Sequence, residues 1–139
     1  MQLAGDAHIT PDTLRHSVFR DAAVGVCTLV SATGAADPAE RSRVADRIGS
    51  TPALNHFPSQ ELRTLFEDNW RRVTLDPAFG RAYVLQQVAR ATGRPAQARA
   101  AVRVGLEIAE SAGEFDTREA AALRECCRVL RLAPAEFGL

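Results

Sequence analysis

The sequence has no lysine, no excess of either charge and no long apolar run. Its seventeen basic residues, all arginine, balance seventeen acidic ones, so net charge does not direct the chain toward nucleic acid or an anionic membrane. No stretch approaches the roughly 20 apolar residues that a membrane-spanning helix needs. The first twelve residues lack the basic start and apolar run of a signal peptide. We therefore expect a soluble, cytoplasmic protein.

Cysteine and histidine are also scarce, which argues against a disulfide framework and a structural metal. The three cysteines are Cys27, Cys126 and Cys127. An odd number with one adjacent pair is a poor start for a secreted disulfide scaffold. No cysteine stands two or three residues from another, as zinc sites usually require, and the three histidines share no helical ligand spacing. We expect a reducing compartment and no structural zinc.

Helix signals cover most of the chain, while strand signals are nearly absent. Apolar residues recur at helical spacing without sustained alternation, and proline, aspartate and glycine stand where helices begin and end. We expect six helices, running from Pro11 to Gly34, Pro38 to Gly49, Ser59 to beyond Val73, Pro77 to Gly93, Pro95 to Ala112, and Asp116 to before Pro134. With a closing turn, they predict an all-α fold, a compact bundle of six to seven helices.

The segment that follows Ser59 carries the clearest core signal. Ser59 can cap this helix, whose apolar stripe is wide enough to face the interior. The stripe consists of Leu62, Leu65, Phe66, Trp70 and Val73. Because 46% of the 139 residues are hydrophobic, the chain can bury one core without further support. We expect residues 1–11 to form an N-terminal tail and residues 12–139 a single domain.

A short acidic motif occurs twice. The pattern G-x-x-D-x-x-E appears 79 residues apart, first as Gly34, Asp37 and Glu40 and then as Gly113, Asp116 and Glu119. The same offset pairs the apolar Val44 with Leu123 and Ile48 with Cys127. This near-repeat predicts two pseudo-repeated units, each a helix, a glycine turn and an acid-started helix.

The motif has two interpretations. Aspartate three residues before glutamate is typical of a capping box, in which both side chains satisfy N–H groups at a helix start. Carboxylates near a tight glycine turn can instead bind calcium or magnesium, which prefer oxygen ligands. An EF-hand is excluded, because the ligand positions ahead of the two glycines hold no carboxylate except Glu110. Capping is the favoured interpretation.

The carboxyl-terminal part of the chain resembles a known family. The residues that carry the resemblance are Ala101–Gly105, Ile108–Ala109, Gly113, Phe115–Asp116, Glu119 and the ending Pro134–Leu139. They are similar to the tellurite-resistance TerB family. The similarity is dense from about Ala98 to Leu139 and fainter from about Val24 to Gly93.

The resemblance implies a TerB-like helical domain without known catalysis. Such a protein is encoded with other tellurite-resistance genes, is cytoplasmic, and associates with membrane partners of that system at the inner membrane face. The family also implies an acidic cluster that binds a divalent metal. Carried over to this chain, the cluster comprises Asp37, Glu40, Glu110, Glu114, Asp116 and Glu119, with turn glycines Gly34 and Gly113. Thr33 and Ala112 replace the aspartates expected before the glycines, which degrades the site.

We therefore expect a non-enzymatic component of a tellurite-resistance and chemical-stress response, acting through protein–protein interaction with weak Ca²⁺ or Mg²⁺ binding. No nucleophile, base and orienting group can be named. The alternative is a divalent-cation sensor.

Two other hypotheses are disfavoured. The cysteines could react with tellurite, but an apolar helix face makes a thiol inert. Arg124, Arg128 and Arg131 could bind nucleic acid, but interspersed acids favour a solvated face.

Overall fold

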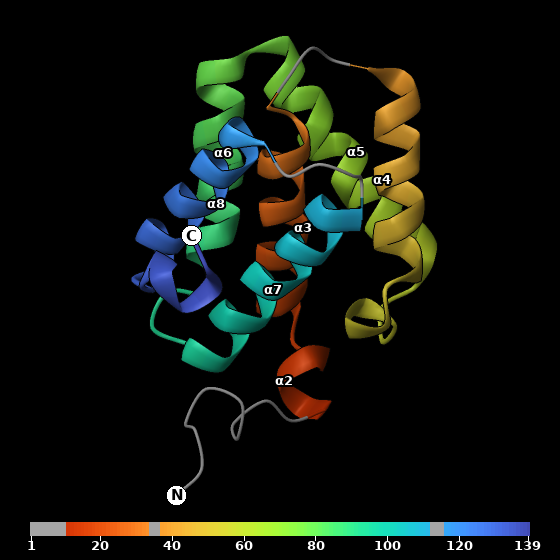
Figure 1. Cartoon of the computed structure of the whole chain (residues 1–139). Helices are drawn as coiled ribbons and strands as arrows, with labels where there is room; N and C mark the ends of the chain where they lie inside the picture. Colours follow the sequence, from red (N-terminus) through yellow and green to blue (C-terminus); the bar gives the residue numbers. More distant parts are fainter. Residues whose placement is uncertain (1–10, 34–36, 112–115) are drawn as a thin grey trace, which may run out of the picture.

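The computed structural model describes residues 11–33, 37–111 and 116–139. These parts of the chain form a bundle of seven α-helices and two short 3₁₀ helices, without a strand (Figure 1). In chain order the elements are α2 (Pro11–Arg15), α3 (Ser17–Ser31), α4 (Pro38–Ser50), η1 (Pro52–Leu54), α5 (Ser59–Leu75), α6 (Pro77–Ala89), α7 (Pro95–Ser111), α8 (Thr117–Leu130) and η2 (Pro134–Phe137). The all-α prediction is confirmed.

Helix α3 runs through the middle of the bundle (Figure 1). Every residue from Val18 to Val30 except Arg20 is buried, and α3 packs against α5, α6, α7 and α8. Its closest neighbour is α7, where Gly105 lets the two backbones approach. A Cβ at Gly105 would overlap the side chain of Val26. Glycine is therefore required at this crossing by packing rather than by backbone conformation.

The first expected helix is in fact two helices. The chain leaves helical geometry at His16, which has φ −79° and ψ 138°, and α3 begins one residue later. The Nδ1 atom of His16 accepts a hydrogen bond of 3.2 Å from the backbone N–H of Val18, so histidine caps α3. The prediction of one continuous helix was wrong because histidine is not among the residues that usually occupy this position.

The other helix starts follow their capping residues, with one exception. Asp37, Asp76 and Asp116 are the N-caps of α4, α6 and α8, as the sequence predicts. Ser59 is not a cap: it is the first residue of α5, after Pro58. Its hydroxyl donates a hydrogen bond of 2.7 Å to the carbonyl oxygen of Gly49 instead. Ser59 thus ties the start of α5 to the end of α4.

The predicted core positions lie in the interior. Leu62, Phe66, Trp70 and Val73 of α5 are buried, and Leu65 is partly buried. The repeat also has structural counterparts, since the paired positions Val44 and Leu123, and Ile48 and Cys127, are all buried. None of the described helices combines the length and apolar content that a bilayer crossing requires.

Candidate functional site

Two helices, α4 and α8, begin with acidic residues at the end of the bundle where α3 stops (Figure 1). The carboxylate of Asp37 accepts a hydrogen bond of 3.0 Å from the backbone N–H of Ala39 and so caps α4. At α8, the carboxylate of Asp116 accepts a bond of 2.8 Å from the N–H of Glu119. The Glu119 side chain accepts one of 3.0 Å from the N–H of Asp116. The second copy of the motif is therefore a complete capping box, and the first supplies an aspartate cap.

Glu119 links the two copies of the motif electrostatically. Partial burial raises the pKa of its carboxyl group above the usual range, and the negative charges of Asp116 and Glu40 raise it further. Glu40 belongs to the first copy and stands 79 residues before Glu119. Their charges interact because the fold brings the two carboxyl groups within range of each other's electrostatic field. Three of the six predicted ligands thus lie in one region.

Of the other predicted ligands, the structure describes Asp37, which caps α4, and Glu110. Glu110 is exposed near the end of α7. Glu114, the two turn glycines and Ala112 lie outside the described residues. Within residues 11–33, 37–111 and 116–139, no three histidine, cysteine, aspartate or glutamate side chains are grouped closely enough to hold a metal ion. Because the candidate set includes Glu114, the metal site stays a prediction.

A guanidinium lies beside these carboxylates. Arg118, in the first turn of α8, is exposed, and its Nη1 donates a hydrogen bond of 3.4 Å to the backbone carbonyl of Thr33. This bond is long for a contact between nitrogen and oxygen. The positive charge offsets part of the field of Asp116 and Glu119, and so weakens the attraction of this region for a cation.

The environment of the three cysteines is that of unreactive core side chains. All three thiols are free and fully buried. Burial raises the pKa of Cys27 far above its usual range, and the nearby Cys126 raises it further. Burial also raises the pKa of Cys126 to about 12 and that of Cys127 to about 11. The thiolate is the reactive form of cysteine, and a raised pKa keeps each thiol protonated. The three side chains also lack the electropositive, accessible surroundings of a reactive cysteine.

A different surface feature stands out at the corner between α5 and α6. Leu75 is 78% exposed and Phe79 79% exposed, and Tyr83 is also at the surface. The guanidinium of Arg72 lies over the ring of Tyr83 at 4.0 Å from its centroid. We refer to Leu75, Phe79 and Tyr83 as the apolar corner. Exposed apolar side chains that together form a contiguous patch are typical of an interaction surface.

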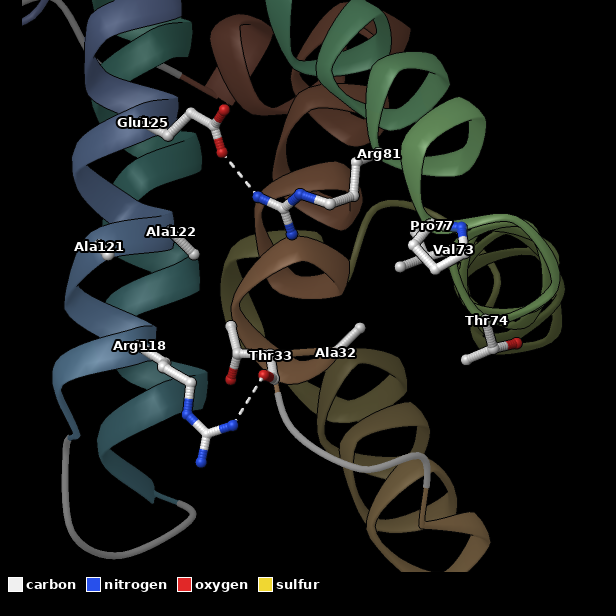
Figure 2. A pocket seen from close by; sticks show the side chains of 10 residues that line it. All are labelled: Ala32, Thr33, Val73, Thr74, Pro77, Arg81, Arg118, Ala121, Ala122 and Glu125. Carbon is white, nitrogen blue, oxygen red and sulfur yellow. Dashed lines mark hydrogen bonds and ion pairs between the residues drawn. The ribbon is translucent and has the colours of Figure 1, made fainter.

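A groove of about 540 Å³ lies between α8 and the start of α6 (Figure 2). The end of α3 lies between these two walls, and Arg118 and Thr33 stand at one end of the groove (Figure 2). Arg81 of α6 and Glu125 of α8 form an ion pair of 2.6 Å at the other end. Alanine, valine and proline side chains line the space between. The groove therefore combines an apolar floor with the guanidinium of Arg118, which lies next to the acidic helix starts.

Sequence patterns did not identify the apolar corner or the groove. Phe79 directly precedes Gly80, and Tyr83 directly precedes Val84. Gly80 and Val84 belong to the buried face of α6. Because both sets have the same helical spacing, the spacing alone does not show which set is buried. The useful signal was Gly80, which marks the side on which α6 approaches another backbone. The groove joins residues of α5, α6 and α8 with the two residues that follow α3, and no local pattern records their proximity.

A comparison with known protein families identifies the family of this chain. The family model described as "Tellurite resistance protein TerB" matches residues 20–139. No curated protein matches the chain, and no solved structure does. The matched region covers both copies of the acidic motif, the apolar corner and the groove.

Proposed function

The chain belongs to the TerB family of tellurite resistance proteins, and from this premise we propose that it is a non-enzymatic component of a tellurite-resistance and chemical-stress response. It acts by binding other proteins of that system in the cytoplasm. Its partners are other tellurite-resistance proteins, and membrane partners hold it at the inner membrane face.

The observation that carries this proposal is the apolar corner. Leu75 and Phe79 present most of their surface to solvent. Aromatic and aliphatic side chains of this kind are the anchors of protein interfaces, where burial by a partner recovers the cost of their exposure. Arg72, stacked on Tyr83, adds a residue type that is common at such anchors.

The test is a complementation experiment in cells that lack the gene. The double variant Leu75→Ser and Phe79→Ser removes the two most exposed side chains of the apolar corner without touching the core, so we expect a folded protein that no longer restores growth on tellurite. Ala82→Ser with Gln86→Ser is the matched control, since both positions are exposed on α6. Full tolerance from the corner variant, at equal protein level and helix content, would refute this surface as the functional one.

Weak divalent-cation binding by the acidic cluster is the second part of the proposal. It is supported by the raised pKa of Glu119, which reflects burial first and, to a smaller extent, repulsion by Asp116 and Glu40. A cation would relieve that repulsion. Calcium and magnesium are the candidates, with Glu110, Glu114 and Asp37 as further ligands.

The alternative function is a divalent-cation sensor. A sensor must change its packing on binding, whereas a scaffold need not. Trp70 is buried against Phe66, with ring centroids 5.7 Å apart, so its near-ultraviolet circular dichroism reports on core packing. A spectrum that changes with millimolar calcium or magnesium favours the sensor, and an unchanged spectrum favours the scaffold.

A further inference from the structure

The groove between α8 and α6 has the size and composition of a small-molecule site. Its volume of about 540 Å³ lies within the range of ligand pockets, which are mostly apolar with a few placed polar groups. The floor is built from Val73, Pro77, Ala121 and Ala122. Small side chains at the two α8 positions leave the space open, because a leucine at either one would extend into it.

The charges along the groove are unequal at its two ends. Arg81 is neutralised by Glu125, with which it forms its ion pair. Arg118 has no carboxylate partner among the described residues, and its contact is the long hydrogen bond to the Thr33 carbonyl (Figure 2). A guanidinium binds a carboxylate or phosphate with two parallel, charge-assisted hydrogen bonds, which are shorter and stronger than this one. Of the two arginines, Arg118 is therefore the one whose guanidinium can bind an anion, although the neighbouring charges of Asp116 and Glu119 weaken the attraction.

A second groove shows that this arrangement is not general. It has a volume of about 610 Å³ and follows α5, with Arg20 and Arg71 on its walls. Arg20 pairs with Asp21 and Glu61, and Arg71 pairs with Asp68. Both arginines of this groove are therefore already neutralised by ion pairs, and three carboxylates line it. An anion has less reason to bind there.

We propose that the groove beside Arg118 binds a small amphipathic organic anion, with its anionic group on Arg118 and its apolar body on the floor toward Arg81. Residues 118 and 125 are seven positions apart on α8, which is about 10 Å along a helix. The ligand is therefore short, and it carries a single charge, because Arg81 at the far end is already paired with Glu125 and does not offer a second anion site. None of the three residues of the apolar corner lines this groove.

The experiment titrates the full chain with 4-phenylbutyrate and follows backbone amide signals by NMR. We expect saturable shifts centred on Thr33, Thr74 and Ala121. Two further probes separate the contributions: 4-phenylbutan-1-ol has the apolar body without the charge, and acetate has the charge without the body. Each should bind at least tenfold more weakly. Equal affinity for the alcohol, or shifts that lie elsewhere, would overturn the proposal.

Two variants test the groove from opposite directions. Arg118→Gln removes the cation, and Ala121→Leu fills the space from an exposed position of α8; each should reduce the affinity for 4-phenylbutyrate at least tenfold. Arg128→Gln is the matched control, because Arg128 is exposed on the same helix and does not line the groove. If Arg118→Gln and Ala121→Leu bind as tightly as this control, the assignment is wrong.

Discussion

The backbone of Gly80 lies directly against the carbonyl group of Arg72, so α5 and α6 meet at a contact that admits no side chain. A Cβ at Gly80 would fall 2.6 Å from the Cα of Val73 and closer still to the Arg72 carbonyl. Backbone atoms cannot move aside as the end of a flexible side chain can. We expect Gly80→Ala to lower the free energy of unfolding by about 1–3 kcal/mol or more. Urea denaturation measures this change.

The control for that substitution is Gly49→Ala. A Cβ at Gly49 would meet the flexible Arg63 side chain, with its Nε at 3.3 Å, rather than a backbone. In this case the change should be small, or stabilising by about 0.4–1 kcal/mol through the unfolded state. Equal destabilisation by the two substitutions would show that the α5–α6 contact is not the cause.

Trp70 is the largest residue of the α5 stripe and is 4% exposed. Trp70→Ala should cost about 3 to 5 kcal/mol of unfolding free energy, because it removes a large side chain from a packed core. Phe79→Ala is the comparison, since Phe79 is 79% exposed and its loss should change stability by less than about 0.5 kcal/mol. A cost below about 1 kcal/mol for Trp70→Ala would contradict its place in the core.

The thiols should be protected in the folded state. With all three cysteines fully buried and their pKa values raised, we expect native protein to react with Ellman's reagent only as fast as it unfolds. The three thiols should all react at once in denaturant. Rapid modification of one thiol in native protein would reopen the hypothesis of a reactive cysteine.

Glu119 makes stability depend on pH in a defined direction. Its pKa is raised in the folded state, so the folded protein holds this proton more tightly than the unfolded chain does. The stability gained by protonation is present below the ordinary glutamate pKa and is lost as pH rises through the folded value. Glu119→Gln keeps an oxygen for the capping box and removes the charge.

We therefore expect Glu119→Gln to raise the unfolding free energy at pH 7 by a few tenths of a kcal/mol, a small effect because solvent screens a partly exposed group. The gain should shrink as pH falls through the raised folded pKa, and it should be absent below the ordinary glutamate value of 4.5. Thermal unfolding across this range measures it. A loss of stability at pH 7 would mean that the favourable interaction of the charge with the helix start outweighs the repulsion.

The last prediction concerns the missing aspartates at Thr33 and Ala112. We expect little or no melting shift of the unmodified protein in millimolar calcium or magnesium. Thr33→Asp with Ala112→Asp returns a carboxylate to each half and should create a clear shift. A ligand at 100 times its dissociation constant stabilises a fold by about 2.7 kcal/mol, which is several degrees for this chain length. Without cation the double variant should be less stable, because it adds like charges.

Two results would contradict that expectation. A strong shift in the unmodified protein would mean that Glu110 and Glu114 replace the missing ligands. A double variant that ignores both ions would leave helix capping as the purpose of the acidic motif. In that case the role of Asp37 and Asp116 would be limited to capping α4 and α8.

The fold could be predicted from the sequence where one residue type has one strong local effect. Aspartate followed by proline marks the starts of α4 and α6, and Asp116 with Glu119 marks α8. The break at His16 could not be predicted, because it depends on a ring nitrogen that few sequences use as a cap. Local patterns succeed at the aspartates because aspartate is a common capping residue, and they fail at His16 because histidine is a rare one.

The candidate site was predictable only in its composition. The repeat named the acidic residues, but the proximity of Glu40 and Glu119 follows from the packing of α4 and α8 against other helices. The exposure of Phe79 depends likewise on which side of α6 meets α5, and that is decided by Gly80 and Arg72. Such relationships between distant segments are tertiary properties.

The burial of α3 on all sides has a consequence for how this protein can diverge. A helix with no solvent-facing stripe offers almost no position where a substitution is neutral, since each side chain from Val18 to Val30 other than Arg20 fills space shared with another helix. Mutational drift is therefore confined to the outer helices and to the ends of the bundle. New binding specificities can arise on the surfaces of α5, α6 and α8 while the central helix holds their positions fixed.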